Sequence, residues 1–220
     1  QASFKIESSI LSVDSNGRVN PADLKSAIKP NTGLISIMTV NNEVGTIQPI
    51  EELTQISREE KIPFHSDTVQ AFGKMPLSVK DLGTEYLSFS AHKFYGPNGS
   101  GALFVKSPLL PDPIFLGGSH ENNRRAGTEY LAAIAGFVTA LELFVTQPVF
   151  DRAALKPFIS SLTSLDSLDG INLICSNSLV LPNTCCFSVA GLDSFSLLAA
   201  LDLNGFCVSS GSACSSGALN

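Results

Sequence analysis

The chain has 220 residues, of which 44% are hydrophobic and 15% are charged. This balance supplies enough apolar side chains for a substantial core and argues against intrinsic disorder. The net charge of −6, with 14 scattered Lys and Arg residues, argues against binding to nucleic acid or to an anionic membrane.

Strand-like and helix-like segments alternate along the first two-thirds of the chain. Residues 49–60 predict a helix, with Pro49 at its start and Ile50, Leu53 and Ile56 on one face. Short apolar runs predict strands over residues 34–40, 62–67, 86–91 and 101–105. This order predicts an α/β fold, with a mostly parallel sheet covered by helices.

The last third of the chain has a different pattern of predicted elements. A long amphipathic helix is predicted over residues 128–145, and its apolar run is far shorter than the ~20 residues that a membrane span needs. Pro148 then interrupts the pattern. Further segments follow: a helix over 151–165, an alternating stretch over 183–190 and a helix over 194–203. We therefore predict two domains, residues 1–147 from a larger one and residues 148–220 from a smaller α+β one.

The five cysteines stand at positions 175, 185, 186, 207 and 214. Their number is odd, and their spacing matches no metal site, so a reduced, intracellular protein with a free thiol is predicted. Cys214 lies in a segment rich in Ser and Gly, which predicts a mobile, accessible loop. The other four lie in apolar stretches, which favours structural roles.

Polar side chains follow three of the predicted strands, where parallel sheets place their ligand sites. They are Asn42, Asp67, and the group Ser90, His92 and Lys93. Each has an ordinary alternative, since Asn42 suits a turn, Asp67 suits a helix cap and Lys93 suits a solvated surface. Together they place an acid, an amine, an imidazole, a hydroxyl and an amide at one edge of the sheet.

This combination fits the chemistry of pyridoxal 5′-phosphate. An amine in a partly desolvated pocket can form a Schiff base with an aldehyde. A carboxylate opposite the pyridine nitrogen keeps that nitrogen protonated and makes the ring an electron sink. Ser90, His92 and the backbone after them could hold the phosphate.

Five segments also resemble a known family. The sequences "VNNEVGTIQPI", "HSDTVQAFGK", "SFSAHKFYGP", "RRAGTE" and "VSSGSAC" follow one another as in the NifS/IscS-like cysteine desulfurases. These are pyridoxal-phosphate enzymes of fold type I in the class V aminotransferase group. The resemblance runs from about residue 10 to the last residue, and it implies that fold for this chain.

The resemblance implies roles for the cofactor-binding residues. Lys93 resembles the Schiff-base lysine and Asp67 the partner of the pyridine nitrogen. Gln70 matches the residue that hydrogen-bonds the phenolic oxygen, and Ser90 and His92 match phosphate ligands.

Three further roles are implied by the same resemblance. Asn42 matches the amide that contacts the ring oxygen and the substrate carboxylate. Thr128 resembles a phosphate ligand donated by the neighbouring subunit, which implies a homodimer. Cys214 resembles the catalytic nucleophile.

The implied reaction removes sulfur from L-cysteine. Lys93 acts as the base at the substrate α-carbon, and Cys214 attacks the sulfur, which leaves L-alanine and a persulfide on the enzyme. The expected recipient is a sulfur-acceptor or iron-sulfur scaffold protein, and the expected location is the cytoplasm or the mitochondrial matrix.

Some family features are absent from this sequence. The phosphate loop and the histidine that stacks on the cofactor precede the segments quoted above, and the arginine that binds the substrate carboxylate follows them. We therefore expect the chain to be the middle of a longer enzyme. Two alternatives stay open: a selenocysteine lyase, and a catalytically incomplete fragment that acts only as a binding or structural module.

Overall fold

The computed structural model describes residues 6–175 and 179–211, and these residues form parts of two compact units. The first unit comprises Gln1–Asp14, Arg18–Val40 and Gln48–Val149, and the second comprises Ser15–Gly17, Asn41–Ile47 and Phe150–Asn220. The two units are defined by the contacts within this chain. The domains 1–147 and 148–220 stay a prediction.

The first unit contains a four-stranded sheet in the order β1-β2-β3-β4. Its strands are β1 (Ile35–Ser36), β2 (Phe64–Asp67), β3 (Tyr86–Ser90) and β4 (Gly101–Val105). The pairs β1–β2 and β2–β3 are parallel, whereas β3–β4 is antiparallel. The predicted α/β class with a mostly parallel sheet is thus confirmed.

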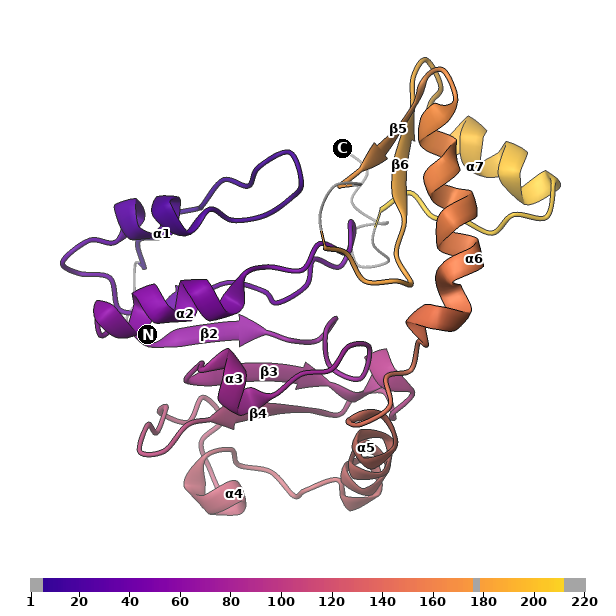
Figure 1. Cartoon of the computed structure of the whole chain (residues 1–220). Helices are drawn as coiled ribbons and strands as arrows, with labels where there is room; N and C mark the ends of the chain where they lie inside the picture. The colour runs from indigo at the N-terminus through magenta and orange to yellow at the C-terminus, as the bar shows by residue number, and fades with distance from the viewer. Residues whose placement is uncertain (1–5, 176–178, 212–220) are drawn as a thin grey trace. The chain divides into compact units, whose positions relative to one another are not determined.

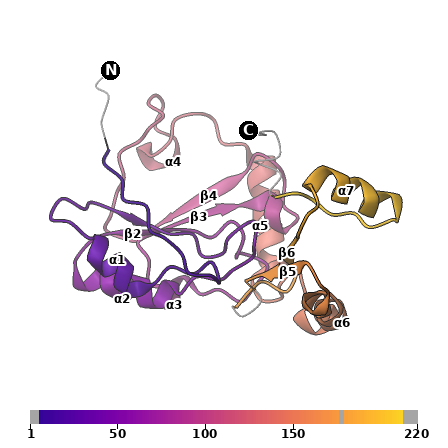
Figure 2. The same cartoon turned by 90° about the horizontal axis from the view of Figure 1, so that it is seen from above.

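Helices α1 (Pro21–Ala27), α2 (Ile50–Glu59) and α3 (Val79–Leu82) lie together on one side of this sheet (Figures 1 and 2). Strand alternation points one set of side chains toward them. The resulting core is built around Ile35, Leu53, Phe64 and Leu87. Leu53, Phe64 and Leu87 have no exposed surface, so this face is a packed core and not a ligand site.

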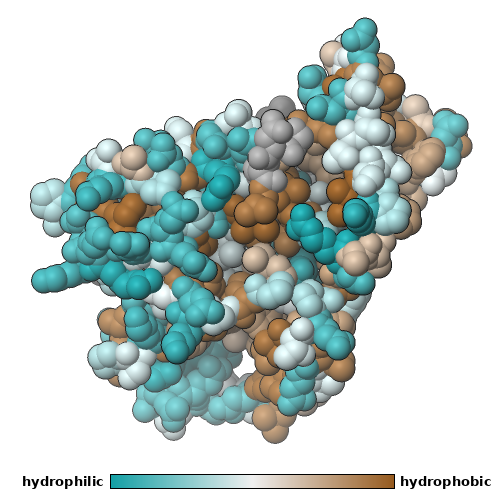
Figure 3. All heavy atoms as spheres, in the orientation of Figure 1, coloured by the Kyte–Doolittle hydropathy of each residue, from teal (hydrophilic) through white to brown (hydrophobic). Residues whose placement is uncertain are grey.

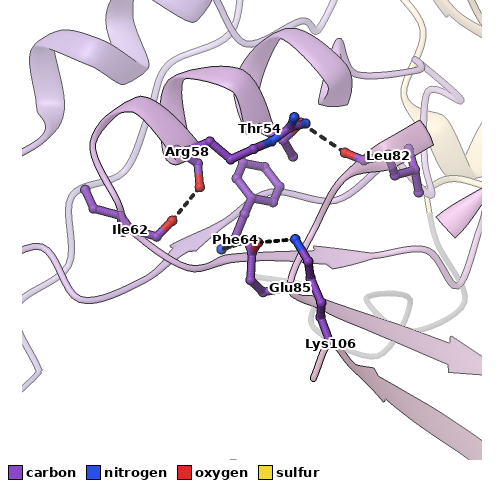
Figure 4. A network of polar contacts seen from close by, with 8 residues as sticks. Thr54, Arg58, Ile62, Phe64, Leu82, Glu85 and Lys106 are labelled. Carbon is purple, nitrogen blue, oxygen red and sulfur yellow. Dashed lines mark hydrogen bonds and ion pairs between the residues drawn. The ribbon is translucent and has the colours of Figure 1, made fainter. Parts of the chain in front are cut away.

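Buried hydroxyl groups attach α2 to its surroundings. The Thr54 hydroxyl donates to the Leu82 carbonyl at 3.0 Å (Figure 4), and the Ser57 hydroxyl donates to the Ile62 carbonyl at 2.5 Å. At the start of β2, the Phe64 N–H donates to Glu85 Oε2 at 3.1 Å (Figure 4). These bonds satisfy polar groups that would otherwise be costly to bury.

Helix α5 (Leu131–Phe144) closes the first unit through a second cluster of apolar side chains. Phe94 lies at its centre, fully buried, with Phe72 at a ring-centroid distance of 5.3 Å and Phe137 of α5 at 5.8 Å. The outer side of α5 keeps many apolar side chains exposed, and they gather at the lower right of Figure 3.

Two predictions for this unit need correction. The strand predicted over 34–40 is limited to Ile35–Ser36, although the N–H groups of Ile37 and Thr39 still donate to the carbonyls of His65 and Asp67 beyond it. The helix predicted from residue 128 begins at Leu131, after Tyr130, whose φ of −83° and ψ of 79° are not helical. Helices α1 and α4 (His120–Asn123) were not predicted.

The second unit contains α6 (Arg152–Thr163), η2 (Ser164–Ser167), β5 (Ile171–Ile174), β6 (Cys186–Val189) and α7 (Ser194–Leu203). Strands β5 and β6 form an antiparallel pair. The bounds of α7 agree with the prediction, and Asp193 caps it by accepting from the Ser196 N–H at 3.0 Å. Strand β5 was not predicted.

In the part of the chain that the structure describes, no helix is long and apolar enough to cross a membrane.

Candidate active site

Asp67 is the last residue of β2, and its side chain is exposed at the carboxyl end of the strand. One carboxylate oxygen, Oδ1, accepts from the Val69 N–H at 2.8 Å. This bond starts the turn over residues 69–74 and restrains the carboxylate. The capping interpretation of Asp67 therefore describes part of its environment, and it leaves the side chain accessible to a ligand.

Lys93 follows the neighbouring strand β3 on the 3-10 turn η1 (Ala91–Phe94). Ala91 and Phe94 are fully buried and anchor the turn, while His92 is exposed and Lys93 is half-buried. The hydroxyl of Ser90, the last residue of β3, lies 2.8 Å from Nδ1 of His92. A hydroxyl, an imidazole and an amine are thus presented within four consecutive residues.

The pairing of β2 with β3 brings these two groups to the same edge. Asp67 is the register partner of Ser88, two residues before Ser90. The next residue, Thr68, bonds to the Ser88 carbonyl twice, through its N–H at 3.0 Å and its hydroxyl at 2.7 Å. Since β2 and β3 are parallel, their carboxyl ends, and with them Asp67, Ser90 and the start of η1, are neighbours.

Gln70 lies in the turn after Asp67, and close packing holds this turn against η1. A Cβ built on Gly73 would stand 2.6 Å from Cβ of Phe94, so only glycine fits this contact. Gln70 itself is half-buried, and its Oε1 accepts from Nζ of Lys74 at 2.5 Å. Burial and the positive charge of Lys93 lower the pKa of Lys74 to about 8.

His65 is a residue that the sequence reasoning did not select. It lies two positions before Asp67 on β2, and its ring bridges the strands on either side, with Nδ1 2.8 Å from the Ser36 hydroxyl and Nε2 2.7 Å from the Ser88 hydroxyl. Burial lowers the pKa of His65, while the negative charge of Asp67 opposes that shift. The period of two in strands could have identified it as a neighbour of Asp67 on the same face.

The strand pairing does not bring the other predicted site residues to this edge of the sheet. Asn42 belongs to the second unit and is exposed in a turn, where the Oδ1 atom of Asn41 accepts from the N–H groups of Glu43 and Val44. Thr128 belongs to the first unit, is exposed, and makes no hydrogen bond within the described residues. Cys214 lies outside the described residues, and so does most of the loop predicted to be mobile.

The groups that converge in the first unit suit one ligand better than a metal ion. Among the described residues, no cluster of three or more His, Cys, Asp or Glu side chains could hold a metal. The carboxylate instead matches a protonated ring nitrogen, and the amine matches an aldehyde. The hydroxyl and the imidazole both match a phosphate. The donor set therefore fits pyridoxal 5′-phosphate.

Comparisons with known proteins agree with this interpretation. Residues 3–220 match the family described as aminotransferase class-V. A cysteine desulfurase IscS from Dictyoglomus turgidum is 46% identical over 217 residues, which are 97% of this chain and 55% of that protein. The chain thus spans about half the length of the relatives it matches.

Solved structures show the same similarity at the level of the fold. A NifS-like protein from Rickettsia africae is 34% identical and superimposes with a TM-score of 0.84 over 92% of this chain and 57% of that one. A structure titled "SspA in complex with cysteine" is 30% identical, with a TM-score of 0.79 over 96% of this chain and 58% of that one. These findings confirm the resemblance and the fold type I assignment.

Proposed function

The chain belongs to the class V aminotransferase family, and from this membership we propose that it acts as a pyridoxal 5′-phosphate-dependent cysteine desulfurase. The substrate would be L-cysteine, and the products L-alanine and an enzyme-bound persulfide. The observation that carries the proposal is the meeting of Asp67, Ser90, His92 and Lys93 at one edge of the sheet. The relatives' names supply the choice of reaction.

The residues at this edge would hold the cofactor. Lys93 Nζ would bind its aldehyde, and the Asp67 carboxylate would keep a proton on its ring nitrogen. Ser90 Oγ and His92 would hold the phosphate, and the Gln70 amide would contact the phenolic oxygen. When bound, the cofactor supplies an electron sink for the carbon from which a proton is removed.

Lys93 has a second proposed task, which is to move a proton. With the substrate in place, Nζ would be a free amine that accepts the α-proton of L-cysteine. Buried Ala91 and Phe94 hold the backbone on both sides of His92 and Lys93, which restrains the position from which the amine would act. The half-buried position limits competition by water.

Cys214 is the proposed acceptor of sulfur. Its thiolate would form a bond to the substrate sulfur, while the carbon–sulfur bond breaks and its electron pair stays with the three-carbon product. The carbon then takes up a proton and leaves as L-alanine. Cys186 is a poorer candidate, because burial raises the pKa of its thiol and disfavours the thiolate.

A homodimer is proposed from the surroundings of Thr128. Exposed apolar side chains flank this loop, and they are Ile114, Phe115, Leu116, Tyr130 and Leu131. Such a concentration of exposed apolar surface is typical of a contact between proteins. A second subunit could cover it and receive Thr128 as a phosphate ligand, while a sulfur-acceptor or iron-sulfur scaffold protein would take the persulfide sulfur.

The first experiment tests cofactor binding. The protein is mixed with pyridoxal 5′-phosphate, reduced with borohydride, and digested for mass spectrometry. We expect the label on Lys93, and we expect it to be lost in Lys93→Ala but kept in the control Lys80→Ala, which alters an exposed lysine of α3. A protein that takes up no cofactor would support the alternative of a binding or structural module.

The second experiment tests the reaction. Incubation with L-cysteine and a dithiol reductant, which reduces the persulfide sulfur to sulfide, should yield L-alanine and sulfide in equal amounts, whereas release of selenide from L-selenocysteine alone under the same conditions would assign a selenocysteine lyase. Cys214→Ser should keep cofactor binding and lose persulfide formation, while Cys185→Ser should keep both. Normal sulfur transfer by Cys214→Ser would show that another thiol is the nucleophile.

A further inference from the structure

Lys74 is a buried lysine that none of the roles above uses. Its relative exposure is 8%, although lysine is among the residues least often buried. Its Nζ donates to Oε1 of Gln70 at 2.5 Å, one helical turn earlier in the chain. A buried amine therefore contacts a residue that is proposed to bind the cofactor.

The chemistry of the two groups determines which way the Gln70 amide points. An ammonium group has three donors and no acceptor, so the amide must turn its oxygen toward Lys74. Within the described residues, Nε2 of Gln70 donates to no protein atom. The N–H groups are consequently the end of the amide that is available to a ligand, and Gln70 would act there as a donor.

The packing around this turn holds the pair in place. Gly73 contacts Phe94 of η1, and the Val149 N–H donates to the Gly73 carbonyl at 2.7 Å. The strands, η1 and α5 that pack here carry these titratable side chains: His65, Asp67, Tyr86, His92, Lys93 and Glu142. Of these, Lys93 is the one whose charge adds to burial in lowering the pKa of Lys74.

We propose that Lys74 is a positioning residue, which holds the Gln70 amide with its oxygen turned inward so that its N–H groups donate to the acceptor oxygen of the bound cofactor. The inference rests on the proposed function for the identity of the ligand. The orientation itself rests on the hydrogen bond and on the burial of Lys74, and it exists without any ligand.

The first test therefore uses the cofactor-free protein. The side-chain amide signals of Gln70 are assigned by nuclear magnetic resonance in the parent protein and in Lys74→Met, Lys74→Arg and the exposed-lysine control Lys80→Met. We expect Lys74→Met to move the Gln70 signals and Lys74→Arg, which keeps a donor, to move them much less. Unchanged Gln70 signals in a folded Lys74→Met protein would overturn the inference, whether or not cofactor binds.

The second test uses the protein loaded with pyridoxal 5′-phosphate, and it compares Lys74→Met, Gln70→Ala and the double variant. Each single variant should weaken cofactor binding about three- to tenfold and shift the absorption band of the bound cofactor, because a donor to a charged oxygen is lost or misdirected. The double variant should be no worse than Gln70→Ala, since Lys74 acts through Gln70.

The outcomes separate the inference from the proposed function. Additive losses in the double variant would overturn the positioning role while leaving cofactor binding intact. Rescue by Lys74→Arg supports the role of the donor against a purely structural one. A parent protein that fails to bind cofactor overturns the proposed function, and the amide signals of Gln70 still decide whether Lys74 orients it.

Discussion

The two faces of the four-stranded sheet have opposite characters. On one face, Phe64 and Leu87 are completely buried beneath α1, α2 and α3. On the other face, the next residues along the same strands, His65 and Ser88, are half-exposed and bond to each other through Nε2 and Oγ at 2.7 Å. Successive residues of one strand thus serve the core and the proposed site in turn.

This difference shows how the site can be rigid and accessible at once. Asp67 and Ser90 are the last residues of β2 and β3, and they lie on the polar face of the sheet. The buried residues of the same two strands fix the position of each strand. A polar residue can change here without unfolding the protein, while a change on the buried face moves the whole edge. The predictions below test this division.

The largest effect is expected for Asp67→Asn. The amide keeps the shape and the acceptor for the Val69 N–H, but it loses the negative charge that would hold a proton on the cofactor ring. We expect the turnover of the proposed desulfurase reaction to fall about a thousandfold and the free energy of unfolding to change by less than about 0.5 kcal/mol. Asp23→Asn, in the exposed first turn of α1, is the control for turnover. Comparable activity in Asp67→Asn would contradict the role of the charge.

The buried face is tested by Leu87→Ala, at a residue with no exposed surface. The change should lower the free energy of unfolding by about 3 kcal/mol, measured by urea titration, because it leaves a cavity beneath the helices. Its matched control is Leu103→Ala on β4, which is 52% exposed and pairs with Ser88. The Leu103→Ala change should lower the free energy of unfolding by less than about 1 kcal/mol. Equal losses would show that the two faces do not differ.

Lys74 places a charge in the packed region behind the site, and its effect depends on pH. Its pKa falls from 10.5 to about 8 on folding, so between these values the unfolded chain binds more protons than the folded protein. The contribution of Lys74 to the free energy of unfolding is therefore lowest at neutral pH, and it rises as the pH increases from about 8 to 10.5.

Lys74→Met removes this dependence. At pH 7 the free energy of unfolding of the variant should exceed that of the parent protein by up to about 3 kcal/mol. The loss of the hydrogen bond to Gln70 reduces this gain. The difference should shrink by pH 10.5. Thermal unfolding followed by circular dichroism at several pH values measures it, and parallel pH curves for the two proteins would rule out a buried charged Lys74.

The smallest effect is expected for His65→Phe, on the polar face. The change removes the hydrogen bonds to Ser36 and Ser88. Because the ring is only half-buried, the free energy of unfolding should fall by about 1 kcal/mol at pH 7. Burial lowers the pKa of His65, so the parent protein loses this stability as the pH falls below the usual value of about 6.5. His65→Phe should lack that loss. Unfolding measured at pH 5 and pH 7 tests this expectation.

Much of the framework follows from local patterns in the sequence. Helix α2 starts after Pro49, and helix α7 starts after the cap Asp193, because capping and apolar periodicity act within a few residues. The location of Asp67 and Ser90 at strand ends was predictable for the same reason. The roles of Asn42, Thr128 and Cys214 came from the resemblance alone, and they stay predictions.

By itself, the sequence determined the class of the fold, the order of its motifs and the residue types gathered at the carboxyl ends of the strands. Only the tertiary structure decided that β1 has two residues, that β4 runs antiparallel to β3, and that Lys74 is buried behind Gln70. It also placed His65 between Ser36 and Ser88, which are 29 and 23 residues away along the chain. Strand length, register and desolvation depend on contacts between distant segments, and no local pattern of residues encodes them.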